Sequence, residues 1–419
     1  GRMSKKRVYA ALELADGEVR LAVMEVYEGR ANVLRIERAP AAGLSGTTIT
    51  DEASVVASIR QALTAAQAAL GYRIERVVLL VPSVNVKDSS QKIRVGIEDG
   101  TKTVRLFHIQ QGLTRAQQLR RDDDAVFVNA NRIQYEVNGE TSSKLPLSEQ
   151  CEEFVMDVDL LYADKDTVYA YARAVEQANL EILDLVLDSY AAAQETAALA
   201  QSSERPVIQV QLEANHTLLT YFQDGRLRSS FDLDKGYMWF MEPLRKKYRL
   251  GREVTFRLLQ NCFSTDMQDS SVIIYIEQKE DQRVEITAGE LAKTVVPRIR
   301  EWIAGINEAC APIVNRGKVK YIVTGKGSNI PVLKELEPAF NAPARVYVET
   351  SVGARDGAFV SLLGSVYALM DINRIRHDDR ISVNNNELEA SIDQINARSH
   401  HGDGGFTRKM KSVVLTDEG

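Results

Sequence analysis

The side chains that most often carry out catalysis or bind metals are few in this sequence and lie far apart. The chain has five histidines and three cysteines, and none stands at the spacing of a zinc site or a disulfide framework. His216 has no nucleophile at a meaningful spacing, so neither a Ser/His/Asp nor a Cys/His arrangement is indicated. These patterns predict no metal site, no structural disulfide and no nucleophilic catalysis.

The composition narrows the class of protein further. A chain of 419 residues is too long for one hydrophobic core, and its net charge of −6 argues against a general nucleic-acid binder. The start, Met3 to Arg7, is followed by a short apolar run that acidic residues interrupt, which does not suit a signal peptide. No window reaches the roughly 18 apolar residues of a spanning helix, so we expect a cytoplasmic protein.

A three-strand pattern occurs twice and must position whatever chemistry the chain has. Alternating, strand-like runs at 7–14 and 19–27 flank Asp16-Gly17, a strong hairpin signal, and a third run follows at 31–38. The same order recurs at 207–212, 216–222 and 227–233, with Asp224-Gly225 as a turn. This repetition predicts an internal duplication and therefore two lobes of α/β type.

Between the two copies lies a segment of different texture, in which we expect an inserted α+β subdomain. Its expected elements include a strand at Thr103 to Ile109 and one short helix at Thr114 to Arg121. The last folded element is expected to be a helix from Ala358 to Met370, before the sequence turns polar. The predicted domains are a first lobe at 7–82 and 164–203, the insert at 83–163, a second lobe at 204–371 with a smaller subdomain at about 252–286, a flexible linker at 372–404, and a terminal segment at 405–419.

The order of these elements resembles the FtsA family, the actin-fold proteins that anchor the bacterial division ring to the membrane. The resemblance runs from Arg7 to about Met370 and includes the segments 129–139 and 320–331 and Gly364. It rests on order and spacing, since no single motif is strong. It implies an actin-like two-lobed fold of duplicated ribonuclease H-like domains, with the FtsA-type inserted subdomain.

The resemblance also implies a pocket for ATP and Mg²⁺ between the lobes, formed by glycine-rich turns whose backbone amides bind phosphate. Family positions that bear glycine or hydroxyl residues carry other side chains here, and the general acid/base position is an amide. The aligned pocket positions are Glu13, Asp16 and Gly17 in the first turn, Gln211 and Glu213 in the second turn, Arg257 and Gln260 on a helix, and Gly325, Lys326 and Gly327 in a loop.

A carboxylate at a phosphate turn repels the ligand, because like charges a few ångströms apart cost on the order of a kcal/mol even near the surface. The sequence therefore predicts that ATP binding is absent or very weak, that no cofactor is tightly bound, and that the protein is not an ATPase. The alternative is that a working site lies one register away.

The final segment has the pattern of an interfacial membrane helix. If residues 405–419 are helical, an apolar face of Phe406, Met410, Val413 and Val414 is flanked by Arg408, Lys409 and Lys411. FtsA proteins end similarly, after a comparable linker. The alternative is a basic, disordered end.

These observations, together with what the resemblance to the FtsA family implies, leave three functions open. The first is a division-ring adaptor that self-associates, binds the tubulin-like ring protein FtsZ through the subdomain near 252–286, and lies on the inner face of the cell membrane at the division site. The second is an active actin-type ATPase. The third is a scaffold for another machine, such as pilus assembly.

Overall fold

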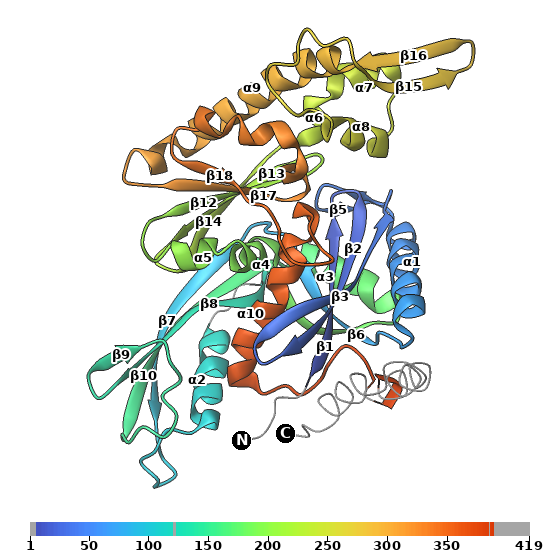
Figure 1. Ribbon diagram of the computed structural model, residues 1–419. Coiled ribbons are helices and arrows are strands. Elements are labelled where there is room, and N and C mark those ends of the chain that lie inside the picture. Colours follow the sequence, from blue (N-terminus) through green and yellow to red (C-terminus); the bar gives the residue numbers. More distant parts are fainter. Residues whose placement is uncertain (1–5, 120–122, 385, 389–419) are drawn as a thin grey trace, which may run out of the picture. The chain divides into compact units, whose positions relative to one another are not determined.

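The computed structural model describes residues 6–119, 123–384 and 386–388, which form two compact units (Figure 1). Among these, the first unit contains residues 6–191, 351–354 and 362–388, and the second contains residues 192–350 and 355–361. The predicted second lobe, 204–371, differs at its end, since residues from Leu362 onward belong to the first unit. The cause is the last long helix, α10 (Val360–Arg376), whose residues Leu362, Leu363 and Val366 are buried.

The first unit is built on a five-stranded sheet with the order β11-β6-β1-β2-β3. β1, β2 and β3 form an antiparallel meander, while β6 runs parallel to β1 and β11 runs parallel to β6. The helices α1 and α3 contact this sheet and each other. The bounds are β1 (Arg7–Ala15), β2 (Glu18–Tyr27), β3 (Arg30–Pro40), β4 (Leu44–Ser45), β5 (Thr48–Ile49), α1 (Glu52–Leu70), β6 (Arg76–Val81), α3 (Lys165–Gln177), β11 (Glu181–Leu187) and α4 (Asp188–Glu195), the last of which continues into the second unit.

The second unit repeats this topology in a sheet with the order β14-β13-β12-β17-β18. β12, β13 and β14 are again an antiparallel meander, and β17 and β18 again add in parallel. The bounds are α5 (Ala198–Gln201), β12 (Val207–Leu212), β13 (Thr217–Gln223), β14 (Arg226–Leu233), α6 (Tyr237–Phe240), α7 (Glu242–Tyr248), α8 (Arg252–Leu259), β15 (Ile273–Lys279), β16 (Gln282–Thr287), α9 (Ala288–Val314), β17 (Lys320–Thr324), η1 (Lys326–Asn329), η2 (Pro331–Lys334), η3 (Glu337–Ala339), β18 (Ala344–Val346) and η4 (Gly357–Phe359).

The predicted duplication is therefore confirmed, strand by strand and with the same sheet order. Each copy opens with a strand that is buried along nearly its whole length, because β1 and β12 each lie between neighbours on both sides. Asp224 and Gly225 both have positive φ (55° and 72°), as a two-residue hairpin turn requires.

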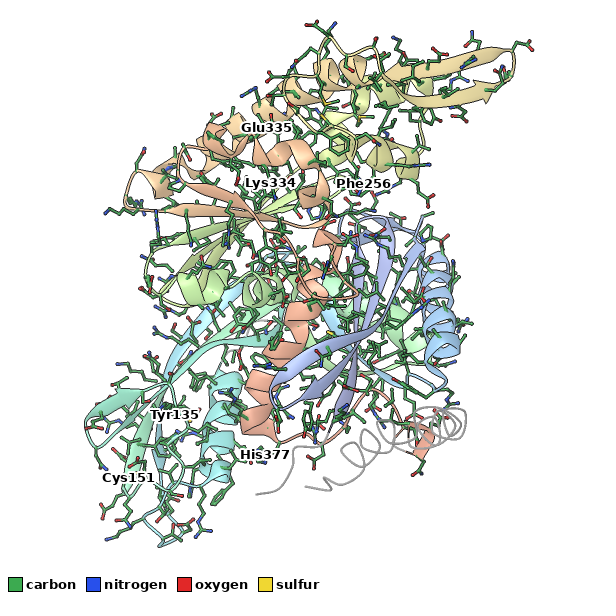
Figure 2. The ribbon with its side chains drawn as sticks, viewed as in Figure 1. Tyr135, Cys151, Phe256, Lys334, Glu335 and His377 are labelled. Atoms are coloured by element: carbon green, nitrogen blue, oxygen red, sulfur yellow. The ribbon has the colours of Figure 1, made fainter. Side chains whose placement is uncertain are left out.

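The inserted subdomain has its own sheet, in the order β7-β10-β8-β9, and its own apolar core around Tyr135 (Figure 2). The predicted strand at Thr103 to Ile109 is wrong, and the short predicted helix is longer. Residues 106–119 form the single helix α2, because Ile109, Leu113 and Ala116 share a buried face. The bounds are β7 (Lys87–Gly96), α2 (Leu106–Leu119), β8 (Ala125–Val137), β9 (Glu140–Ser142) and β10 (Glu153–Asp164).

The predicted flexible linker at 372–404 is corrected over its first part, since α10 extends to Arg376 and the residues after it pack on the first sheet. Ser382 donates its backbone N–H to Val8 O at 3.0 Å, and its Oγ accepts the Ala10 N–H at 2.7 Å. Val383 forms an isolated antiparallel β-bridge with Ile74. The segment therefore adds backbone hydrogen bonds beside the first residues of β1 and β6. The rest of the predicted linker, from 389 onward, lies outside the described residues.

Residues 357–376, which include α10, are long and apolar enough to cross a membrane by length and composition alone, but 72% of the 18-residue apolar window within them is buried inside the protein. It is therefore a core helix.

Candidate functional site

The turn that ends β1, Glu13–Gly17, holds a buried ion network in the first unit. Glu13 faces Arg20 across the hairpin, and Arg20 Nη1 lies 3.3 Å from Glu13 Oε1. Arg20 Nε also lies 2.5 Å from Glu18 Oε1, and the arginine is only 1% exposed. The carboxylate of Glu13 is thus compensated by a neighbouring strand of its own sheet.

The second carboxylate of this turn has a structural partner as well. Asp16 is buried, and its Oδ1 accepts the backbone N–H of Gly46 at 3.1 Å. Gly17 has a φ of 83°, and its carbonyl accepts the Ala41 N–H at 3.0 Å. Asp16 and Gly17 therefore fix the loop that carries β4 and β5.

The turn that ends β12, Gln211–His216, is the equivalent feature of the second unit. Gln211 is buried, and its Oε1 accepts a long hydrogen bond from Gln209 Nε2 at 3.5 Å. The backbone N–H of Glu213 donates to His216 O at 3.0 Å, which closes the turn. Glu213 Oε1 accepts the backbone N–H of Lys326 at 3.4 Å.

The loop Gly325–Gly327 presses directly against this turn. A Cβ on Gly325 would lie 2.7 Å from Leu212 O, and one on Gly327 would lie 2.2 Å from Leu212 Cγ. Lys326 Nζ lies 4.7 Å from the ring centroid of Phe256. Phe256 belongs to α8 and is labelled in Figure 2. The small residues of this loop therefore accommodate Leu212 rather than leave open space beside the turn.

Five of the predicted pocket positions are thus brought together in the second unit: Gln211, Glu213, Gly325, Lys326 and Gly327. Arg257 lies at the exposed side of α8, one residue from Phe256, and Gln260 caps the same helix. Glu13, Asp16 and Gly17 are together in the first unit. The predicted membrane residues, from Phe406 to Val414, lie outside the described residues.

The residues at these turns do not suit a nucleotide phosphate. A glycine-rich turn binds phosphate through backbone amides that converge on an open space. In the second unit the Lys326 amide already donates to a carboxylate, and that carboxylate would repel an anion. In the described part of the chain, no group of three or more His, Cys, Asp or Glu side chains is placed to hold a metal ion.

Two features of these units were not predicted. Arg20 could have been found, because a hairpin turning at Asp16-Gly17 places residue 20 opposite residue 13. Glu195 and Glu349 gave no sequence signal, since they meet only through the fold of the second unit. Burial, with a hydrogen bond to Glu349 and its charge, raises the pKa of Glu195 from 4.5 to about 8.

The cysteines and His216 show no activated nucleophile. Burial raises the pKa of the Cys262 thiol to about 12 and also raises the pKa of Cys310, which keeps both in the unreactive thiol form. His216 Nδ1 pairs with Asp232 Oδ1 at 2.7 Å.

Comparison with curated proteins shows that the chain is similar to FtsA cell-division proteins; no family model matches it. It is 20% identical over 372 residues to "Cell division protein FtsA" of Bacillus subtilis (strain 168), which covers 87% of this chain and 84% of the relative. The protein of the same name from Enterococcus faecalis is 20% identical over 382 residues, covering 90% and 86%. That from Streptococcus pneumoniae is 18% identical over 372 residues, covering 86% and 80%.

Solved structures show the fold. A chain of the PilM–PilN type IV pilus biogenesis complex superposes with a TM-score of 0.54 at 12% identity, covering 86% of this chain and 98% of that one. MreB5 of Spiroplasma citri, bound to AMPPNP, gives a TM-score of 0.51 at 10% identity, covering 88% and 98%. The fold is therefore actin-like, as the sequence predicted.

Proposed function

From its similarity to FtsA cell-division proteins over most of its length, and from its actin-like fold, we propose that this chain is a cell-division scaffold rather than an ATPase. In this role it self-associates, binds FtsZ, and lies on the inner face of the cytoplasmic membrane at the division site. Its nucleotide binding is very weak or lost. A scaffold of this kind needs surfaces that bind its partners but does not need a hydrolytic site.

The choice of a scaffold over an ATPase rests on the position of the Glu213 carboxylate. This carboxylate lies at the second-unit turn and accepts the Lys326 N–H. The turn therefore already binds a backbone amide of the Gly325–Gly327 loop, and the two segments are in close contact. A phosphate would have to displace that carboxylate and face its charge. The first-unit turn adds to this argument, because Glu13 already has Arg20 as its partner and Asp16 holds Gly46.

Calorimetric titration with Mg-ATP tests the loss of nucleotide binding. We expect no saturable heat, both for the natural chain and for the Arg257→Ala variant, whose side chain is exposed on α8. A micromolar dissociation constant that the Arg257→Ala variant weakens would contradict the proposal and favour an actin-like ATPase.

Binding to FtsZ is tested at the β15–β16 ribbon, part of the subdomain that the FtsA resemblance assigns to this partner. Ile273 and Ile276 of β15 and the preceding Val272 are exposed by 45%, 53% and 64%, and a group of exposed apolar side chains is typical of an interaction surface. In co-sedimentation with polymerised FtsZ, we expect Ile276→Glu to abolish pelleting. The matched control is Gln278→Glu, two residues along the same strand and also exposed, which should pellet normally. Equal pelleting of both variants would remove this surface from the proposal.

Membrane contact rests on the segment 405–419, outside the described residues. Co-sedimentation with anionic liposomes should be lost when the chain is truncated after Gly404. Equal pelleting of the full and truncated chains would contradict the proposed membrane anchor.

A further inference from the structure

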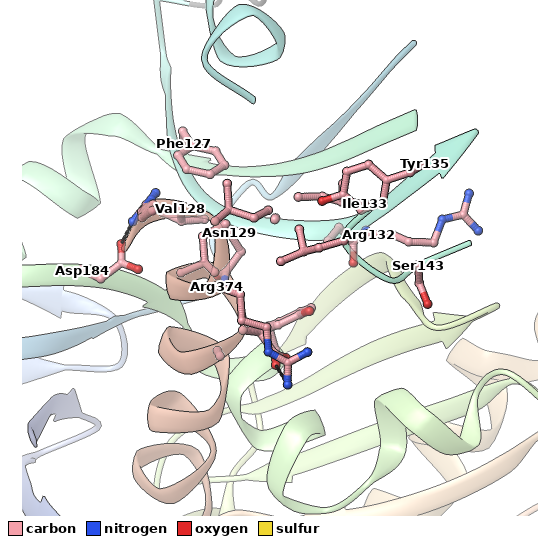
Figure 3. Close-up of a pocket in the computed structure, with 18 of the residues that line it drawn as sticks. Phe127, Val128, Asn129, Arg132, Ile133, Tyr135, Ser143, Asp184 and Arg374 are labelled. Atoms are coloured by element: carbon pink, nitrogen blue, oxygen red, sulfur yellow. Dashed lines mark ion pairs between the residues drawn. The ribbon is translucent and has the colours of Figure 1, made fainter. Parts of the chain in front are cut away.

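A pocket of about 470 Å³ lies in the first unit, formed by β8, the loop that follows β9, and the last turns of α10 (Figure 3). None of its lining residues belongs to the turns described above. Its size falls within the range of 300–1,000 Å³ that is usual for sites of small organic ligands. The proposed scaffold function makes no use of this pocket.

One part of the wall is apolar. Phe127, Ile133 and Leu145 line it from the inserted subdomain, and Ile372 and Ile375 line it from α10. These side chains belong to the apolar core of the inserted subdomain or pack against it, so packing holds them in place. Such a wall suits the hydrocarbon or aromatic part of a ligand.

The charged groups of the wall leave an excess of positive charge. Arg376 pairs with Asp184 at 3.1 Å, and Arg374 approaches Asp371 at 4.0 Å. Two further cations, Arg132 and Lys144, line the pocket, and their side chains have no ion pair with any residue that the structure describes. Four cations against two carboxylates leave a net charge of +2 on the lining.

Of these two cations, Arg132 gives the stronger indication of a ligand site. Its Nε is buried and has no hydrogen-bond partner among the residues that the structure describes, although a buried donor without a partner usually costs about 1–3 kcal/mol. Figure 3 shows Arg132 and Ser143 at one end of the pocket, with Asp184 at the other end. The positive end is therefore separate from the end where a carboxylate already stands.

The strand that carries Arg132 is irregular at the pocket. Its pairing with β10 shifts register twice, which leaves Asn131 and Val128 as extra residues on β8. Both extra residues line the pocket. Bulges of this kind re-aim neighbouring side chains and are common beside binding sites.

We propose that this pocket binds a small organic anion, one that carries a carboxylate or phosphate on an apolar body. The anionic group pairs with Arg132 and Lys144 at the positive end of the pocket. The apolar body lies against Ile133, Leu145 and Ile372. Arginine suits either head group, because its planar donors match the oxygens of both.

Isothermal titration calorimetry with the full chain tests this proposal, using octyl phosphate and octanoate below their micellar concentrations. Both probes should bind saturably, and inorganic phosphate should bind at least tenfold more weakly because it lacks the apolar part. Octyltrimethylammonium, which keeps the chain and reverses the charge, should not bind. Comparing the two anionic probes shows which head group the site prefers.

Variants locate the binding. Arg132→Gln and Lys144→Gln should each raise the dissociation constant about tenfold, the usual scale for a charge-assisted hydrogen bond. Ser143→Trp, at an exposed position of the lining, should block entry without disturbing the core. The matched control is Arg30→Gln, an exposed arginine of the same unit outside the pocket, which should bind as the natural chain does.

Equal binding of the cationic and anionic probes would overturn the proposal, because it would indicate apolar adsorption only. Equal losses in Arg132→Gln and Arg30→Gln would also overturn it, since the effect would then be one of overall charge. The scaffold proposal is untouched by either result, because it is tested with FtsZ and ATP.

Discussion

The two copies of the three-strand unit share a fold but compensate their carboxylates differently. In the first unit, Glu13 and Glu18 surround one buried guanidinium, that of Arg20. In the second unit, Glu213 accepts a backbone N–H, and Glu195 is held by another carboxyl group, that of Glu349. The duplicated topology therefore sets where strands and turns lie, while the groups that compensate the charges differ between the two copies.

The largest effect is expected from removing the guanidinium of the first unit. Arg20→Met removes the cation that pairs with Glu13 and leaves Glu18 only the more distant Arg38, at 3.6 Å, which should lower the free energy of unfolding by about 3–5 kcal/mol. Urea unfolding followed by circular dichroism measures this. The double variant Arg20→Met/Glu13→Gln should recover part of the loss; no recovery would mean that packing, not charge, dominates at Arg20.

The second-unit turn is expected to depend on close backbone contact instead. Gly236 packs on this turn so tightly that a Cβ would lie 2.2 Å from Glu213 O and 2.4 Å from Ala214 O. Gly236→Ala should therefore destabilise the protein by about 1–3 kcal/mol, because backbone atoms must shift. Thermal unfolding would show it.

The control for this prediction is Gly305→Ala in α9, where a Cβ meets nothing within 4 Å. That change should stabilise the protein slightly, since alanine favours a helix interior over glycine. If both substitutions have the same effect, the contact at Gly236 is not what holds the turn.

The carboxyl pair of the second unit predicts a dependence of stability on pH. Because the folded pKa of Glu195 is raised from 4.5 to about 8, its contribution to stability is complete below pH 4.5 and is lost as the pH rises through 8. Between pH 5 and pH 9 we expect the free energy of unfolding of the natural chain to fall by on the order of 1–3 kcal/mol, and we expect Glu195→Gln to remove this fall. Melting temperatures of the two proteins over this range give the comparison.

The matched control is Glu204→Gln, an exposed carboxylate of the same unit. Its pH profile should follow that of the natural chain. A natural chain and a Glu195→Gln variant with parallel profiles would mean that the two carboxyl groups do not share a proton.

The smallest effect is expected at Glu213. Glu213→Gln removes the charge but keeps an oxygen that can accept the Lys326 N–H, and that bond is long, at 3.4 Å. Stability should change by less than about 1 kcal/mol. A much larger change in urea unfolding would show that the carboxylate itself holds the Gly325–Gly327 loop in place.

The sequence by itself determined the duplicated strand units and their hairpin turns, and its resemblance to the FtsA family implied the actin-like fold. The strand units and turns depend on local signals, namely alternation of apolar residues and Asp-Gly turns, which adjacent residues carry. It also placed Glu13, Glu213 and Gly325 at the turns, because strand ends follow from the same pattern. Local signals are misleading at residues 103–109, where the segment that leads into α2 has a strand-like pattern. They are misleading also at 381–383, where a segment with polar neighbours packs on the first sheet.

Only the tertiary structure decided which groups compensate one another. The contact between Glu213 and Lys326 joins residues 113 positions apart, and the proximity of Glu195 and Glu349 and the pocket beside Arg132 also join distant elements. Side-chain charges act over a few ångströms in space, and no spacing along the chain records which strands and helices the fold brings to that distance.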